Sequence, residues 1–205
     1  MTRQDVEELR ARMRACFRFD GVYTLASGRT SKYYYDGKLG TLDPSFAWIL
    51  GNLLVDVIHD SGAEAVGGLE IGSVPIAQSV GIAAHLRGIS LPTFIVRKEA
   101  KEHGTRSQIA QAYVPDGPLL KPGRRVAIVD DVITTGGSIL QAYNAVLELG
   151  CEVTIIIALV ERHESGGKAL RDLDVPVLAL FSTDEEGKLR DEFVAHVVPA
   201  GTGAR

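Results

Sequence analysis

The sequence contains few cysteines, and this scarcity argues against two kinds of small-protein architecture. Only Cys16 and Cys151 occur among the 205 residues, and no Cys-x-x-Cys pair is present. A disulfide framework needs several cysteines, and a structural zinc site needs closely spaced ligands. We therefore expect neither. At this length, a single domain of residues 1–205 can bury enough surface to be stable without crosslinks.

The sequence also lacks an excess of basic residues and any long apolar run. Lys and Arg number 22 against 26 Asp and Glu, so the net charge is -4, whereas nucleic-acid-binding domains are usually basic. No stretch approaches the ~20 apolar residues of a membrane span, and the N-terminus has no apolar signal-peptide core. We therefore expect a cytoplasmic protein without a nucleic-acid or membrane partner.

Several common catalytic motifs are missing as well. The chain has no Walker A loop, no Gly-x-Gly-x-x-Gly fingerprint, no Gly-x-Ser-x-Gly elbow and no His-Glu-x-x-His. Simple NTPase, dehydrogenase, hydrolase and zinc-protease interpretations are therefore excluded.

What the sequence does contain is an alternation of helical and strand patterns, which predicts an α/β fold with a central parallel sheet flanked by helices. The expected core spans about 44–182, with helices at 44–60, 74–87, 137–149 and near 166–172, and strands at 63–69, 92–97, 125–130, 153–160 and 175–181. An N-terminal helix at about 2–16 leads to a small subdomain at about 17–42, where aromatic and turn residues mix. The tail from about 199 is expected to be flexible.

The most informative segment is residues 126–138, Val-Ala-Ile-Val-Asp-Asp-Val-Ile-Thr-Thr-Gly-Gly-Ser. An apolar strand is predicted to end at Asp130 and Asp131, and a turn rich in hydroxyls and glycines then starts a helix. In open α/β sheets ligands bind beyond the carboxyl ends of strands, and a helix start favours a phosphate. We interpret the segment as a site for a phosphorylated ribose. The alternative, an ordinary turn with acidic capping residues, would leave buried charges without partners.

A second cluster of polar residues follows the strand at 92–97. Its cationic members are Arg97, Lys98, Lys101, His103 and Arg106. The polar loop from 97 to about 115 is long for a compact domain, and such loops are often lids. It lies at the same sheet edge as the aspartates, so both could bind one polyanion, although a solvated charged loop is the commoner alternative. The turn at 70–73 is a third possible anion cradle.

These segments resemble a known family. Residues 126–138 resemble the 5-phosphoribosyl 1-pyrophosphate (PRPP) signature of type I phosphoribosyltransferases. Arg97-Lys98-x-x-Lys101-x-His103-Gly104 resembles the mobile loop of the orotate phosphoribosyltransferases, and residues 25–31 and 33–36 are similar to their orotate-side hood. The resemblance implies the type I phosphoribosyltransferase fold, with residues 17–42 as a small N-terminal hood.

The same resemblance implies transfer of the phosphoribosyl group from PRPP to orotate, giving orotidine 5′-monophosphate and pyrophosphate in pyrimidine (UMP) biosynthesis. It implies Mg²⁺ held mainly by PRPP and water near Asp130 and Asp131, with no direct protein ligand. It also implies a homodimer whose 97–113 loop reaches the partner's site. Two alternatives stay open: a purine or other base phosphoribosyltransferase, and a non-catalytic PRPP-sensing regulator of the same fold.

The resemblance also assigns residue roles. Catalysis is assigned to Lys101, His103 and Asp131. PRPP binding is assigned to Arg97, Lys98, Lys101, His103, Asp130, Asp131, Val132, Ile133, Thr134, Thr135, Gly136, Gly137 and Ser138. Orotate binding is assigned to Tyr34, Tyr35, Thr134 and Arg162, and the pyrophosphate loop comprises Glu70, Ile71, Gly72 and Ser73.

Three positions depart from the family pattern. Ala26 stands where some members carry a lysine before Ser-Gly-Arg, and Ile71-Gly72 stands where some carry Tyr-Lys. Because neither side chain at 71–72 is charged, backbone N–H groups would have to bind pyrophosphate at this turn. The third departure is Ile109-Ala-Gln-Ala-Tyr113, where Ile-Glu-Gly is common.

Overall fold

The computed structural model describes residues 3–24, 30–99, 108–115, 117–163, 168–170 and 172–190. Its helices are α1 (Arg3–Ala15), α2 (Lys38–Thr41), α3 (Pro44–Asp60), α4 (Ser73–Leu86), α5 (Gly137–Leu147) and the 3₁₀ turn η1 (Lys168–Leu170). Its strands are β1 (Phe17–Arg18), β2 (Tyr23–Thr24), β3 (Thr30–Ser31), β4 (Tyr34–Tyr35), β5 (Ala65–Leu69), β6 (Thr93–Val96), β7 (Ile109–Gln111), β8 (Tyr113–Val114), β9 (Gly117–Pro118), β10 (Arg125–Ile133), β11 (Glu152–Glu161) and β12 (Val177–Ser182).

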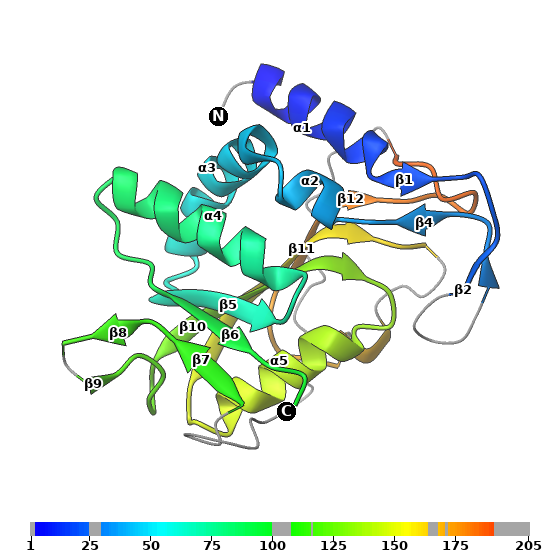
Figure 1. The fold of residues 1–205 in the computed structure, drawn as a ribbon. Helices are drawn as coiled ribbons and strands as arrows, with labels where there is room; N and C mark the ends of the chain where they lie inside the picture. Colours follow the sequence, from blue (N-terminus) through cyan, green and yellow to red (C-terminus); the bar gives the residue numbers. More distant parts are fainter. Residues whose placement is uncertain are drawn as a thin grey trace.

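A six-stranded sheet forms the centre of the molecule, in the order β12-β11-β10-β5-β6-β7 (Figure 1). Every neighbouring pair is parallel except β6 and β7. The predicted α/β class with a mainly parallel sheet is therefore confirmed.

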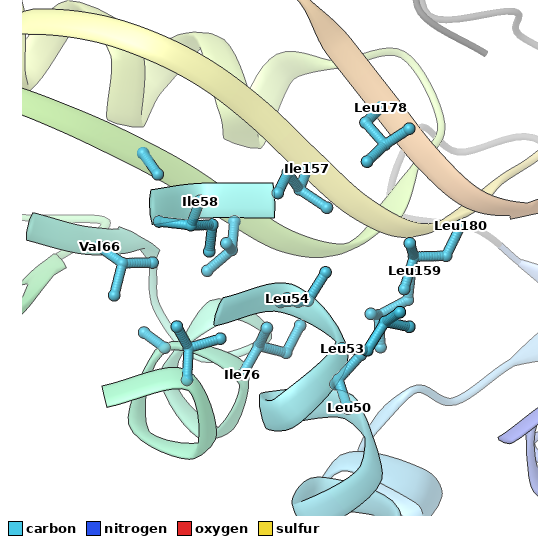
Figure 2. Packing of buried hydrophobic residues seen from close by; sticks show 14 of the residues in the cluster. Leu50, Leu53, Leu54, Ile58, Val66, Ile76, Ile157, Leu159, Leu178 and Leu180 are labelled. Atoms are coloured by element: carbon cyan, nitrogen blue, oxygen red, sulfur yellow. The ribbon is translucent and has the colours of Figure 1, made fainter. Parts of the chain in front are cut away.

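Helices cover both faces of this sheet (Figure 1). The α3 and α4 helices pack together on one face, and α5 covers the other. Figure 2 shows how leucines and isoleucines of α3 point toward β11 and β12, with Ile157 and Leu178 among their neighbours. Truncating a buried side chain of this kind typically costs about 2–5 kcal/mol, so these contacts fix the sheet on which the site is built.

The start of α3 shows how the local sequence sets the helix boundary. The Asp43 carboxylate accepts a hydrogen bond from the Phe46 N–H at 2.9 Å, and Pro44 occupies the first helical position. Both features stabilise a helix start, because an acidic cap satisfies a free donor and proline needs none. The predicted helix at 44–60 is confirmed at both ends.

Three predicted boundaries are wrong. The strand at 125–130 continues to Ile133, because β11 supplies backbone partners for Asp130, Val132 and Ile133 whatever their polarity. Part of the loop predicted at 97–115 is strand β7, whose pairing covers the otherwise open edge of β6. Where a helix was predicted near 166–172, residues 168–170 form a single 3₁₀ turn, and the rest of that range is outside the described residues except for residue 172.

The hood segment at 17–42 contains two small antiparallel ribbons and the short helix α2. One ribbon pairs β1 with β4 and the other pairs β2 with β3. Phe17 packs on Tyr35 with ring centroids 4.9 Å apart, and Tyr35 belongs to the main apolar cluster. The hood segment is thus tied to the core through aromatic contacts. No helix within the described residues is long and apolar enough to cross a membrane.

Candidate active site

The strand order reverses direction between β5 and β10. From β5 the chain proceeds outward through β6 to β7, whereas from β10 it proceeds the opposite way through β11 to β12. Ligands of open α/β sheets bind at such a reversal, beyond the carboxyl ends of the strands. The turn at 70–73 follows β5, and the acidic pair lies near the end of β10, so two sequence-predicted segments meet here.

Asp130 and Asp131 lie inside the strand rather than on the loop after it, as the extension of β10 requires. Asp130 is only 6% exposed, and its Oδ1 accepts the Asp131 N–H at 2.9 Å. Burial raises the pKa of Asp130, and the neighbouring Asp131 carboxylate raises it further. Burial likewise raises the pKa of Asp131. Ionisation of this pair is therefore unfavourable in the folded protein without a ligand.

Two glycines from different segments enclose the Asp131 carboxylate. A Cβ built on Gly72 would lie 2.5 Å from Asp131 Oδ1, and one on Gly37 would lie 2.8 Å from Asp131 Oδ2. Any larger residue at either position would displace the carboxylate. The chain therefore brings three segments together around one side chain: the hood before α2, the turn after β5 and strand β10.

Two lysines moderate the charge of the acidic pair. Lys38 pairs with Asp36 at 2.6 Å, and its positive charge opposes the rise in the pKa of Asp131. Lys98, after β6, does the same for the pKa of Asp130. Lys98 was predicted as a site residue, whereas Lys38 was missed. The signal for Lys38 was its position two residues after the Tyr-Tyr-Asp segment of the predicted hood.

The turn between β10 and α5 has the geometry of an anion site. Gly136 precedes the helix with φ +87°, a left-handed conformation that favours glycine, and no side chain caps the first N–H groups of α5. Thr135, Gly137 and Ser138 are exposed and Thr134 is half-buried. Free donors and the helix dipole favour a phosphate at such a terminus.

The two residues before this turn serve the fold with their side chains. Ile133 is buried in the apolar cluster on the α5 face, and Val132 packs against the cluster on the α3 face. Either residue could therefore contact a ligand only through its backbone. The Ile133 carbonyl accepts the N–H of Arg162 at 3.0 Å, which ties the end of β10 to the residue after β11.

The turn at 70–73 is stabilised by one of its own side chains. The Ser73 hydroxyl is buried and donates to the Leu69 carbonyl at 2.7 Å, so it stabilises the turn. Ile71 is 65% exposed, and the Glu70–Ile71 peptide bond is cis. The Glu70 carboxylate accepts the Lys98 N–H at 3.0 Å, which joins this turn to the start of the basic segment.

Arg162 contacts the hood segment and is 3% exposed. Its guanidinium carbon is 4.2 Å from the centroid of the Tyr33 ring. Its Nε donates to the Tyr33 hydroxyl at 3.1 Å, and one Nη donates to the Ser31 hydroxyl at 3.0 Å. The Tyr33 hydroxyl also lies 3.3 Å from Thr183 Oγ1. These contacts with Tyr33 and Ser31 help to fix the orientation of Arg162.

The two tyrosines predicted to contact orotate lie in different surroundings. Tyr35 is buried, its hydroxyl donates to Met13 Sδ at 3.4 Å, and burial beside Asp131 raises its pKa. Tyr34 is half-buried and stacks on Tyr23 with centroids 5.5 Å apart. The tyrosine that touches Arg162 is Tyr33, to which no role had been assigned.

Some predicted site residues lie outside the described part of the chain. These are Lys101, His103 and the departure at Ala26. Arg97 is described and half-buried, and its N–H donates to the Gln108 carbonyl at 2.8 Å. Within the described ranges, no group of three or more His, Cys, Asp or Glu residues could hold a metal ion.

Comparisons with known proteins agree with this geometry. A family model described as the phosphoribosyl transferase domain matches residues 47–185. That range includes the turn at 70–73 and the whole of β10 and α5, so the fold and the site define a phosphoribosyltransferase.

The similar curated proteins narrow the class further. The chain is 42% identical over 168 residues to the orotate phosphoribosyltransferase of Streptomyces coelicolor, covering 82% of this chain and 88% of that one. It is 37% identical over 164 residues to the Aquifex aeolicus orotate phosphoribosyltransferase, covering 80% and 86%. The chain therefore belongs to the orotate phosphoribosyltransferase family, which acts in pyrimidine biosynthesis.

Solved structures show the same relationship. The Mycobacterium tuberculosis orotate phosphoribosyltransferase in complex with PRPP superposes with a TM-score of 0.69 at 28% identity, covering 87% of this chain and 96% of that one. The adenine phosphoribosyltransferase of Leishmania donovani superposes with a TM-score of 0.58 at 16% identity, covering 90% and 86%. The latter shows the shared fold alone.

Proposed function

We propose that this chain transfers the phosphoribosyl group of PRPP to orotate, giving orotidine 5′-monophosphate and pyrophosphate, with the acidic pair of β10 and the N-terminus of α5 holding the sugar phosphate. The observation that carries this proposal is the convergence at the switch point: Gly37, Gly72 and Asp131 meet beside a helix start that no side chain caps. A ligand with hydroxyls at one end and a phosphate at the other fits these two sets of groups.

The ribose 5-phosphate would lie along residues 130–138. Asp130 and Asp131 would accept hydrogen bonds from the ribose hydroxyls, which offsets the burial that raises the pKa of both. The exposed residues Thr135, Gly137 and Ser138 would bind the 5-phosphate with hydroxyls and backbone N–H groups. Val132 and Ile133 would contribute backbone groups only.

The pyrophosphate would face the cationic segment and the turn at 70–73. Arg97, Lys98, Lys101 and His103 would neutralise it, with Lys101 and His103 acting in catalysis. Because Ile71 and Gly72 carry no charge, this turn would offer backbone donors. A pyrophosphate needs several cations, and these four supply them.

The reaction breaks the bond from C1′ to the pyrophosphate oxygen, and that bond's electron pair leaves with pyrophosphate. The bond from C1′ to a ring nitrogen of anionic orotate forms as the ribose passes through an oxocarbenium-like state. Charge grows on the leaving group, so prepositioned cations lower the barrier. His103 can supply a proton to pyrophosphate, because histidine is a common general acid. The Asp131 carboxylate supports the developing ribosyl cation.

Orotate would bind on the hood side, with its carboxylate toward Arg162. The contacts of Arg162 with Tyr33 and Ser31 fix its guanidinium before substrate arrives, which lowers the entropic cost of binding. Thr134 directly follows β10 and begins the turn before α5, and it would contact the base. Tyr34 and Tyr35 complete the hood wall.

The donor set at the acidic pair fits Mg²⁺ bound mainly through PRPP and water. Mg²⁺ prefers oxygen ligands and keeps several waters, so one or two nearby carboxylates suffice. Asp130 and Asp131 would hold such waters. Bound there with PRPP, the ion supplies positive charge to the pyrophosphate oxygens.

We also propose a homodimer in which the 97–113 loop reaches the partner's site, and a cytoplasmic location. The cytoplasmic proposal draws support from Cys16 and Cys151, which are both buried as free thiols, the state that reducing compartments maintain.

The decisive experiment follows the ultraviolet absorbance of orotate after PRPP and Mg²⁺ are added to the protein. We expect absorbance to fall only when all components are present, with orotidine 5′-monophosphate as product. Parallel reactions with adenine, hypoxanthine and uracil test the other base specificities. Turnover of one of these bases without turnover of orotate would contradict the proposal, as would PRPP binding without turnover of any base.

A further inference from the structure

The backbone at Lys98 is held from two sides by side chains of other elements. Its N–H donates to Glu70 Oε1 at 3.0 Å, and its carbonyl accepts a hydrogen bond from Gln141 Nε2 at 2.9 Å. Glu70 follows β5, Lys98 follows β6 and Gln141 lies in the second turn of α5. Two side chains therefore join the turn at 70–73, the basic segment and the helix of the phosphate site.

The residue before Lys98 is held as well. The Arg97 N–H donates to the Gln108 carbonyl at 2.8 Å, and Gln108 Nε2 donates to the Arg97 carbonyl at 3.0 Å. Residues 97 and 98 thus make four hydrogen bonds through their backbone. A peptide held in this way has one orientation. The direction of the Cα–Cβ bond of Lys98, from which its side chain starts, is fixed with it.

The position of Glu70 needs an explanation, because a carboxylate beside a pyrophosphate site repels the ligand. Like charges a few ångströms apart repel each other more strongly near a protein surface than in bulk water. The hydrogen bond to the Lys98 N–H gives Glu70 a structural role that offsets this cost. Gln141 has the complementary role, since its amide donates to the carbonyl of the same residue.

We propose that Glu70 and Gln141 are positioning residues that act through Lys98. They hold its peptide through the two hydrogen bonds described above, so that the ammonium faces the phosphoribosyl site. This inference rests on the proposed function, because it explains how that site binds PRPP.

The test compares Gln141→Leu with Asn144→Leu. Asn144 lies three residues along α5 and lines the same surface pocket of about 410 Å³ as Gln141. A neutral hydrogen bond contributes about 0.5–1.5 kcal/mol, so Gln141→Leu should raise the KM and Kd for PRPP about 2- to 10-fold. The KM for orotate and the Tm should change no more than in Asn144→Leu. Equal effects of the two variants on PRPP would overturn the proposal.

The role of Glu70 is tested by a conservative variant. Glu70→Gln keeps an oxygen that can accept the Lys98 N–H, whereas Glu70→Ala does not. We expect Glu70→Gln to recover most of the PRPP affinity that Glu70→Ala loses. If the two variants behave alike, Glu70 acts through its charge and not as a positioning residue.

A double-mutant cycle separates action through Lys98 from other effects. In a Lys98→Ala background, Gln141→Leu should change PRPP affinity less than 2-fold, because the side chain that it positions is absent. A change as large as in the wild type would contradict the proposal. Failure of the wild-type protein to convert orotate would instead count against the proposed function, so the two failures are distinguishable.

Discussion

The two sides of the proposed site, which we assign to the phosphoribosyl group and to the base, are built in opposite ways. The phosphoribosyl side is one continuous stretch, from the acidic pair in β10 to the first turn of α5. The base side is assembled from residues far apart in the chain, with Arg162 held by Ser31 and Tyr33 of the hood segment. The charges differ as well, since burial raises the pKa of two carboxylates on one side, whereas the other side carries a buried guanidinium that donates to two hydroxyls.

This difference indicates two ways in which a fold can arrange a binding site before its ligand arrives. On the base side the fold satisfies Arg162 before substrate binds, so the guanidinium is preorganised. On the phosphoribosyl side the fold leaves a pair of carboxylates whose charge is unfavourable until hydroxyls or hydrated cations arrive. Such charge makes the unliganded protein less stable and is a common property of functional sites.

The largest effect is expected from Asp131→Asn, which removes the negative charge while keeping the shape. We expect kcat/KM for PRPP to fall about 10²-fold, comparable to loss of one charge-stabilising group in other enzymes. The KM for orotate should change little, because Arg162 and the hood are untouched. Steady-state kinetics with each substrate varied in turn provides the measurement. An effect mainly on orotate would erase the distinction between the two sides.

A smaller effect is expected from Gly72→Ala. Gly72 has φ -57°, which alanine adopts easily, so the substitution does not strain the backbone. Its effect is steric, because the new Cβ would lie 2.5 Å from Asp131 Oδ1. The carboxylate has little room to move away, since Gly37 lies beside its other oxygen. We expect a loss of about 10-fold in PRPP affinity, since small misplacements of reacting groups are costly. Gly21→Ala is the control, because its Cβ would make only an ordinary contact, 3.6 Å from the Tyr23 ring. Equal PRPP binding in both variants would show that Asp131 can move.

Tyr33→Phe tests the base side. The variant keeps the ring under the Arg162 guanidinium but removes the hydroxyl that accepts from Nε. We expect the KM for orotate to rise about 2- to 10-fold, the value of one hydrogen bond, with PRPP binding unchanged. The matched control is Tyr23→Phe, which removes a hydroxyl bonded to Asp20 on the surface. A larger change in PRPP than in orotate would contradict this division of the site.

A separate effect concerns stability and pH rather than kinetics. Burial and Asp131 raise the pKa of Asp130 in the folded protein. As pH rises above about 4, Asp130 therefore ionises in the unfolded chain before it ionises in the folded protein, and the free energy of unfolding falls. Asp130→Asn removes the ionisable group and with it this decrease in the free energy of unfolding. At pH 7 without ligands, the variant should be more stable by about 1–3 kcal/mol, or several degrees in Tm.

The gain from Asp130→Asn should disappear toward pH 4, where Asp130 is protonated in both states. Thermal unfolding of both proteins across this pH range provides the measurement. Asp56→Asn is the control, because Asp56 pairs with Arg87 on the surface and its pKa is lowered. It should give no gain at pH 7, and a gain of the same size would assign the effect to net charge.

Particular segments show how far the sequence could predict the site. Residues 126–138 are contiguous, so their strand, turn and helix start could be recognised and placed at the carboxyl edge of a parallel sheet. The end of β10 could not be placed, because Asp130 and Asp131 look like loop residues until β11 pairs with them. Lys38 and Tyr33 were missed for a related reason: each acts on a residue more than 90 positions away.

The amino-acid order by itself determined the α/β alternation, the acidic pair, the glycine-rich phosphate turn and the cationic segment after β6. These follow from local periodicity and from chemistry carried by neighbouring residues. Only the tertiary structure decided that Gly37 and Gly72 enclose Asp131, that Tyr33 orients Arg162, and that Glu70 and Gln141 hold Lys98. Those contacts join segments that become neighbours only when the sheet is complete, and no local pattern in the chain specifies them.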